Sequence, residues 1–64
     1  GQSFIDYLTT FRIRMASERL IHTRQTVAEI AYACGFNNLS NFNRAFLSRK
    51  QMPPGEYRRR YQPQ

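Results

Sequence analysis

Cysteine and histidine are scarce in this 64-residue sequence, which has one of each, Cys34 and His22. A single cysteine cannot form an internal disulfide bond, and two candidate ligands cannot complete the four-ligand site of a structural zinc ion. The sequence therefore predicts no metal and no cofactor. We interpret Cys34 as a small core residue rather than a redox site, because free cysteines are among the most buried residue types.

Long apolar runs are absent as well. No stretch approaches the roughly 20 apolar residues that cross a bilayer, and no basic start followed by an apolar stretch marks a signal peptide. We expect a soluble protein with no membrane partner, and a lone thiol fits the reducing cytoplasm.

Acidic residues are few, since four Asp and Glu stand against ten Lys and Arg, for a formal net charge of +6. The excess is uneven, because residues 35–64 contain six basic residues and one acidic residue, Glu56. A basic half indicates a polyanionic partner, duplex DNA or RNA foremost, although a solvated surface that keeps a small domain soluble is the alternative.

Catalytic constellations are missing from the pattern of residues. No nucleophile–base pair, paired carboxylates or glycine-rich phosphate loop stands out. Glu29 belongs to a helix cap, described next. We therefore predict that the chain is not an enzyme and has no catalytic residue.

Start and stop signals predict an all-α fold of three or four helices, because no strand-like alternation occurs. The residues Thr26 to Glu29 form a capping box, Gly35 suits the left-handed position that ends a helix, and Asn37 is a good N-cap. The expected helices run from after Ser3 to about His22, from Val27 to about Cys34, from about Asn38 to Lys50, and from about Pro54 to Arg60.

The first helix is apolar on two sides. One stripe contains Phe4, Leu8, Phe11 and Met15, and a second, broadly opposite, contains Ile5, Ile13, Ala16 and Leu20. A helix apolar on two sides usually packs between two bodies. We expect the second stripe to pack on the other helices and the first to be left for a partner. The alternative is a core helix with a wide apolar arc.

Ala31 and Gly35 have the spacing of a helix-turn-helix, in which a small residue allows close approach and a glycine tolerates positive φ in the turn. Any corner between two helices could show this pair, so the next helix decides its meaning. On that helix Phe42, Ala45 and Phe46 share one face, which we expect to pack on Ile30, Cys34 and Phe36.

The opposite face of the third helix centres on Ser40, Arg44 and Ser48, and Asn41, Asn43 and Leu47 flank it. Such a short-chained polar face fits a major groove about 12 Å wide, where Arg reads guanine and Asn reads adenine. The alternative is a solvated face, which would typically be rich in Glu and Lys. Leu39 is either a core residue or a contact to a thymine methyl group. We therefore predict DNA binding, and the alternative function is a protein-interaction module that docks a partner through Phe4, Leu8, Phe11 and Met15.

Several spaced motifs then agree in order along the chain. They are Gly1-x-Ser3-Phe4-x-x-Tyr7-Leu8, Arg12-Ile13-x-x-Ala16-x-x-x-Leu20, Val27-Ala28-Glu29-Ile30-Ala31-x-x-x-Gly35-Phe36, Ser40-x-Phe42-x-Arg44-x-Phe46 and Pro54-x-x-Tyr57-Arg58. In these residues the chain resembles the AraC family of bacterial transcription regulators, over nearly its whole length. Gln51 departs from the family's common glycine, and Pro53 from its usual serine cap.

The resemblance implies a sequence-specific regulator in the bacterial cytoplasm, often an activator that also touches RNA polymerase. The family's DNA-binding unit has two helix-turn-helix motifs joined by a long linker helix. By this likeness residues 1–25 are the linker helix and its joint, 26–62 the second helix-turn-helix, with a homeodomain-like three-helix unit, and 63–64 a tail. Phe4 and Leu8 would face the first motif, and Phe11 and Met15 a regulatory domain.

The resemblance also assigns roles on the third helix, about 38–50, in the major groove. The base-reading candidates are Leu39, Ser40, Asn41 and Arg44, of which the helical periodicity already selects the last three. The phosphate candidates are Thr26, Asn43, Arg49, Lys50 and Arg58, since helix N-termini and basic side chains both bind phosphate.

Overall fold

A computed structural model describes residues 3–63, so Gly1 and Gln2 of the first motif and Gln64 of the predicted tail lie outside the described residues. The all-α prediction is confirmed, because residues 3–63 form helices and no strand. The helices are α1 (Phe4–His22), α2 (Val27–Ala33), α3 (Leu39–Lys50) and α4 (Pro54–Tyr61).

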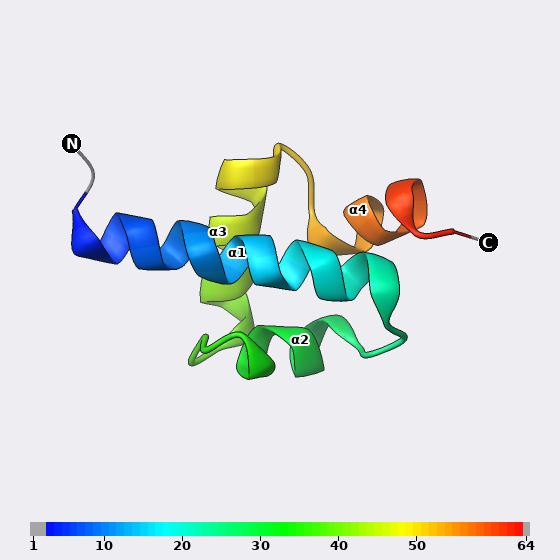
Figure 1. Cartoon of the computed structure of the whole chain (residues 1–64), viewed down its shortest axis with the longest axis horizontal. Helices are drawn as coiled ribbons and strands as arrows, with labels where there is room; N and C mark the ends of the chain where they lie inside the picture. Colours follow the sequence, from blue (N-terminus) through cyan, green and yellow to red (C-terminus); the bar gives the residue numbers. More distant parts are fainter. Residues whose placement is uncertain (1–2, 64) are drawn as a thin grey trace.

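The longest helix, α1, runs along the length of the molecule, and the other three gather around its middle and C-terminal part (Figure 1). In that view α3 crosses behind α1, α2 lies below it, and α4 lies beside its C-terminal end. Ser3 is the N-cap of α1, since its hydroxyl accepts the backbone N–H of Asp6 at 3.1 Å. The blue N-terminal turns of α1 project beyond the other helices.

The core lies where α2, α3 and α4 meet α1. Each helix contributes apolar side chains, and Phe42 and Phe46 of α3 are fully buried at its centre. Phe36 meets Phe42 edge to face at a centroid distance of 5.2 Å, and Tyr57 of α4 meets Phe46 in the same way at 5.3 Å. The buried set is Ile13, Ala16, Leu20, Ile30, Ala31, Cys34, Phe42 and Phe46. The predicted packing of Phe42 and Phe46 on Ile30, Cys34 and Phe36 is therefore confirmed.

The predicted corner after α2 is confirmed at Gly35, which has φ +95°. The N–H of Phe36 donates to the Ala31 carbonyl and the N–H of Gly35 to the Tyr32 carbonyl, which is the Schellman pattern of a helix end. The predicted cap of the next helix was one residue early. Asn38, not Asn37, caps α3, because the turn takes one more residue and the Asn38 Oδ1 accepts the Asn41 N–H at 2.8 Å.

The joint between α3 and α4 also turns through a left-handed residue. Gln51 has φ +65°, a conformation that usually favours glycine, and its side chain Nε2 donates to the Ser48 carbonyl at 3.1 Å. Pro53 precedes α4 without a side-chain cap, and Pro54 occupies the first helical position, where its missing N–H costs nothing.

The two apolar stripes of α1 differ in how far they are buried. Ile13, Ala16 and Leu20 are buried as predicted, whereas Ile5 is exposed, because it lies in the turns that project beyond the other helices. Phe4, Phe11 and Met15 of the first stripe are exposed, and Leu8 is half-buried.

Candidate nucleic-acid interface

The exposed side of α3 is polar along its length. Ser40, Asn41, Asn43, Arg44 and Ser48 are all exposed, while Phe42 and Phe46 anchor the opposite side in the core. We call this exposed set the α3 polar face. The same exposed side of α3 also carries one large apolar residue, Leu47, whose exposed fraction is 51%. The face is therefore available to a groove-shaped partner, because the core holds the helix from behind.

Leu39 begins α3 and is half-buried against the core. This placement is compatible with both interpretations of Leu39, because the side chain packs on the core and is not fully buried. Asn38 uses its side chain for the cap and leaves Ser40 and Asn41 exposed in the first turn. The start of α3 thus offers short polar side chains rather than bulky ones.

The basic candidates at the far end of α3 are held by neighbours. The Arg49 Nε donates to Thr10 Oγ1 of α1 at 3.2 Å. The Lys50 Nζ lies 5.9 Å from the centroid of the Tyr57 ring, within the range of a cation–π contact. Asn43 is exposed on the flank of the α3 polar face. Of these three phosphate candidates on α3, Arg49 is the one whose side chain bonds to α1.

Thr26 already serves the capping box predicted for α2. Its hydroxyl accepts the Glu29 N–H at 3.1 Å, and Glu29 Oε1 accepts the Thr26 N–H at 2.8 Å. The Thr26 backbone N–H, followed by its hydroxyl, holds the pKa of the Glu29 carboxyl below its usual value. The Glu29 carboxylate is therefore charged at neutral pH, and a phosphate at this helix start would meet that negative charge.

Arg58 performs a structural role that the sequence did not predict. Its Nε donates to the Leu20 carbonyl at 3.1 Å and its Nη2 to the Thr23 carbonyl at 3.2 Å. The Gln62 Nε2 donates to the same two carbonyls, at 3.1 and 2.9 Å. Helix α4 thereby satisfies carbonyls at the C-terminal end of α1 that would otherwise lack partners. A phosphate at Arg58 would compete with these bonds.

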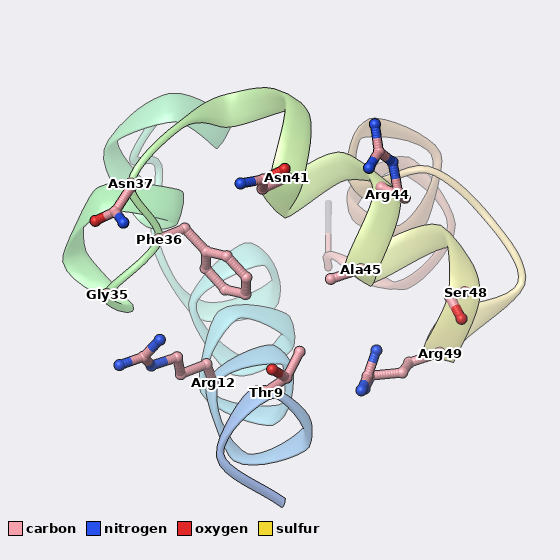
Figure 2. Close-up of a pocket in the computed structure, with 10 residues that line it drawn as sticks. All are labelled: Thr9, Arg12, Gly35, Phe36, Asn37, Asn41, Arg44, Ala45, Ser48 and Arg49. Carbon is pink, nitrogen blue, oxygen red and sulfur yellow. The ribbon is translucent and has the colours of Figure 1, made fainter. Parts of the chain in front are cut away.

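Beside the α3 polar face lies a hollow of about 460 Å³ between α1 and α3. Figure 2 shows Thr9 and Arg12 of α1 on one side and Asn41, Ala45 and Arg49 of α3 on the other. Asn41, Arg44 and Ser48 belong both to this hollow and to the α3 polar face. Arg12 and Thr9 are residues that sequence reasoning missed, because nothing in the pattern reveals which side of α1 meets the α2–α3 turn.

Cys34 is buried, and this burial raises the pKa of its thiol, while the charge of Arg19 lowers it by less. The thiol is thus protonated at neutral pH, as expected of a core residue. Throughout the described part of the chain, no three of the His, Cys, Asp and Glu residues are grouped so that they could hold a metal ion. Nor does any helix between residues 3 and 63 have the length and apolar character needed to cross a membrane.

Known proteins share this sequence pattern. A family model described as a helix-turn-helix domain matches residues 1–60. An AraC-like transcription regulator of Streptomyces lividans is 39% identical over 59 residues, which cover 92% of this chain and 19% of the relative. The transcriptional activator RhaS of Mannheimia succiniciproducens is 36% identical over 58 residues, covering 91% of this chain and 22% of the relative.

A third relative, the transcriptional activator RhrA of Rhizobium meliloti, is 36% identical over 61 residues, covering 92% of this chain and 19% of the relative. The chain thus spans about a fifth of the length of these relatives. No solved structure matches the chain.

Proposed function

The chain belongs to the AraC-type helix-turn-helix family, and on that premise we propose that it binds duplex DNA sequence-specifically as part of a transcription regulator, with α3 in the major groove. The observation that carries this proposal is the α3 polar face, which stands opposite a fully buried Phe42 and Phe46. A helix held in this way can enter a groove about 12 Å wide without giving up its core contacts.

Base reading is assigned to the N-terminal two turns of the α3 polar face. Arg44 can bond guanine bidentately, Asn41 can bond adenine, and Ser40 accepts or donates to either. Leu39 is not fully buried, and its side chain would supply an apolar contact to a thymine methyl group. All four reach from one short segment, as a recognition helix requires.

Phosphate contacts would flank the base-reading residues. Asn43, Arg49 and Lys50 extend from α3, and Thr26 is the N-cap of α2. Arg58 remains a candidate that would have to share its guanidinium with the Leu20 and Thr23 carbonyls. Such contacts fix the register of a protein on the duplex and make affinity depend on salt.

The wider organisation follows from the family and is part of the proposal. Residues 1–25 form the linker helix and joint, 26–62 the second helix-turn-helix, and 63–64 a tail. The exposed side chains of Phe4, Phe11 and Met15, with half-buried Leu8, would meet a first helix-turn-helix and a regulatory domain. A regulator of this kind acts on DNA in the bacterial cytoplasm and touches RNA polymerase when it activates.

Salt dependence of duplex binding tests the proposal. The logarithm of the binding constant should fall linearly with the logarithm of salt, by about 0.9 per phosphate contact. Lys50→Ala should weaken cognate and random duplexes alike and lower that slope by roughly one, because a phosphate contact carries no sequence information. The measurement is a fluorescence anisotropy titration of labelled duplexes at several salt concentrations.

The outcome that contradicts the proposal is binding that does not vary with salt, or no binding at all. Salt-independent association of the chain with another protein, lost when Phe4 and Phe11 are replaced, would instead support the protein-interaction module.

A further inference from the structure

We propose that the hollow between α1 and α3 receives one phosphate of the DNA strand beside α3, and that Arg12 of α1 binds this phosphate. This inference rests on the proposed function, because it needs a duplex seated on the α3 polar face. It adds to that function a DNA contact from α1, the helix whose expected role was only to link and to pack.

The charge of the hollow fits a phosphate. Three of its ten lining residues are arginines, Arg12, Arg44 and Arg49, and none of the other seven is acidic. Thr9, Asn37 and Ser48 add polar groups at its edges. A concave surface with positive charge and hydrogen-bond donors attracts an oxyanion.

The hollow is continuous with the face that would read bases. Asn41, Arg44 and Ser48 line its α3 side and also belong to the α3 polar face. When a helix lies in the major groove, a sugar–phosphate strand runs along each of its flanks. The strand on the α1 flank would therefore pass the mouth of this hollow.

Arg12 lies against the turn that makes the helix-turn-helix. A Cβ atom added at Gly35 would lie 3.0 Å from the Arg12 Nε and 3.2 Å from its Cζ, so the guanidinium lies against the glycine. Between residues 3 and 63, no hydrogen bond or ion pair occupies the Arg12 side chain. Its planar set of N–H donors matches a phosphate bidentately.

Arg49 lines the α3 side of the hollow, on the opposite side from Arg12 (Figure 2). Its Nε donates to Thr10 Oγ1 at 3.2 Å, so the side chain reaches from α3 to α1. The guanidinium has five N–H donors, so this one bond leaves others for an anion. Arg49 therefore adds positive charge to the hollow in which Arg12 binds the phosphate.

The test compares Arg12→Gln with Arg14→Gln in the 64-residue chain. Arg14 is a matched control, because it is an exposed arginine of α1 that does not line the hollow. Arg12→Gln should lower the salt slope of duplex binding by about 0.9 and Arg14→Gln should not. Between about 50 and 200 mM salt, Arg12→Gln should therefore lose about 3.5-fold less affinity than the wild type.

Duplexes with one neutral methylphosphonate linkage locate the contact. A neutral linkage at one position of the duplex should weaken binding by the wild type and by Arg14→Gln. The same linkage should not weaken binding by Arg12→Gln any further. Arg12→Gln could disturb the packing against Gly35, so a second measurement uses the wild type alone. On addition of duplex, the NMR signal of the Arg12 Nε–H should shift and that of Arg14 should stay.

The inference is overturned if Arg12→Gln and Arg14→Gln give equal slopes and equal methylphosphonate profiles, or if the Arg12 Nε–H signal does not respond. In that case a wild type that still binds duplex, with a specificity that depends on Arg44, leaves the proposed function intact. A wild type that binds no duplex at all would remove both.

Discussion

The two ends of α1 have similar side chains and opposite surroundings. At its N-terminal end Phe4, Ile5 and Tyr7 are 77%, 73% and 62% exposed, whereas Ile13 and Leu20 farther along the same helix are 1% and 0% exposed. The difference arises because α3 packs on the middle of α1 and α2 and α4 pack farther toward its C-terminal end, so none of these three helices covers its first turns. Helical periodicity thus shows which side chains share a stripe, and the neighbouring helices decide which part of a stripe becomes core.

The largest expected effect distinguishes these two ends directly. Leu20→Ala should cost about 2–5 kcal/mol of unfolding free energy, because it removes a fully buried side chain and leaves a cavity. Phe4→Ala should change stability by less than about 0.5 kcal/mol, since its ring is mostly exposed. Urea unfolding followed by far-ultraviolet circular dichroism measures both.

A domain below about 70–80 residues rarely has more than about 3–5 kcal/mol of stability, so Leu20→Ala should be largely unfolded without urea. A Phe4→Ala variant as unstable as Leu20→Ala would break the comparison, because it would mean that the N-terminal turns belong to the cooperative core.

A smaller effect is expected where α4 holds the C-terminal end of α1. Arg58→Ala should cost about 1–3 kcal/mol, because the Leu20 and Thr23 carbonyls each lose a hydrogen bond from a charged donor. Arg59→Ala is the matched control, since Arg59 is the exposed next residue and should be nearly neutral. Thermal unfolding of the two variants gives the comparison.

If Arg58→Ala unfolds as the wild type does but loses one unit of salt slope on DNA, the phosphate role inferred from the family outweighs the structural role. Equal losses of stability in Arg58→Ala and Arg59→Ala would show that the bonds to α1 contribute nothing specific.

Local signals in the sequence were sufficient for most of the fold. The capping box at Thr26 and Glu29 and the positive φ of Gly35 each depend on neighbouring residues, so spacing alone predicted them. The sequence predicted Asn37 as the cap of α3, but the turn takes one more residue, so Asn38 caps the helix instead.

The features that sequence reasoning missed join residues far apart in the chain. Arg58 meets Leu20 across 38 positions, and Arg12 meets the turn at Gly35, and neither pairing has a local signature. Exposure of the α3 polar face was predicted because the opposite face is aromatic. The hollow beside it was not, since it exists only where α1 crosses α3.

The central claim is that α3 reads bases through Arg44, and binding selection from a randomised duplex library tests it most directly. The wild type should enrich a motif, and Arg44→Ala should lose preference at one base pair while binding the enriched duplex about 1–3 kcal/mol more weakly. The same enriched motif and the same affinity for both proteins would contradict the account.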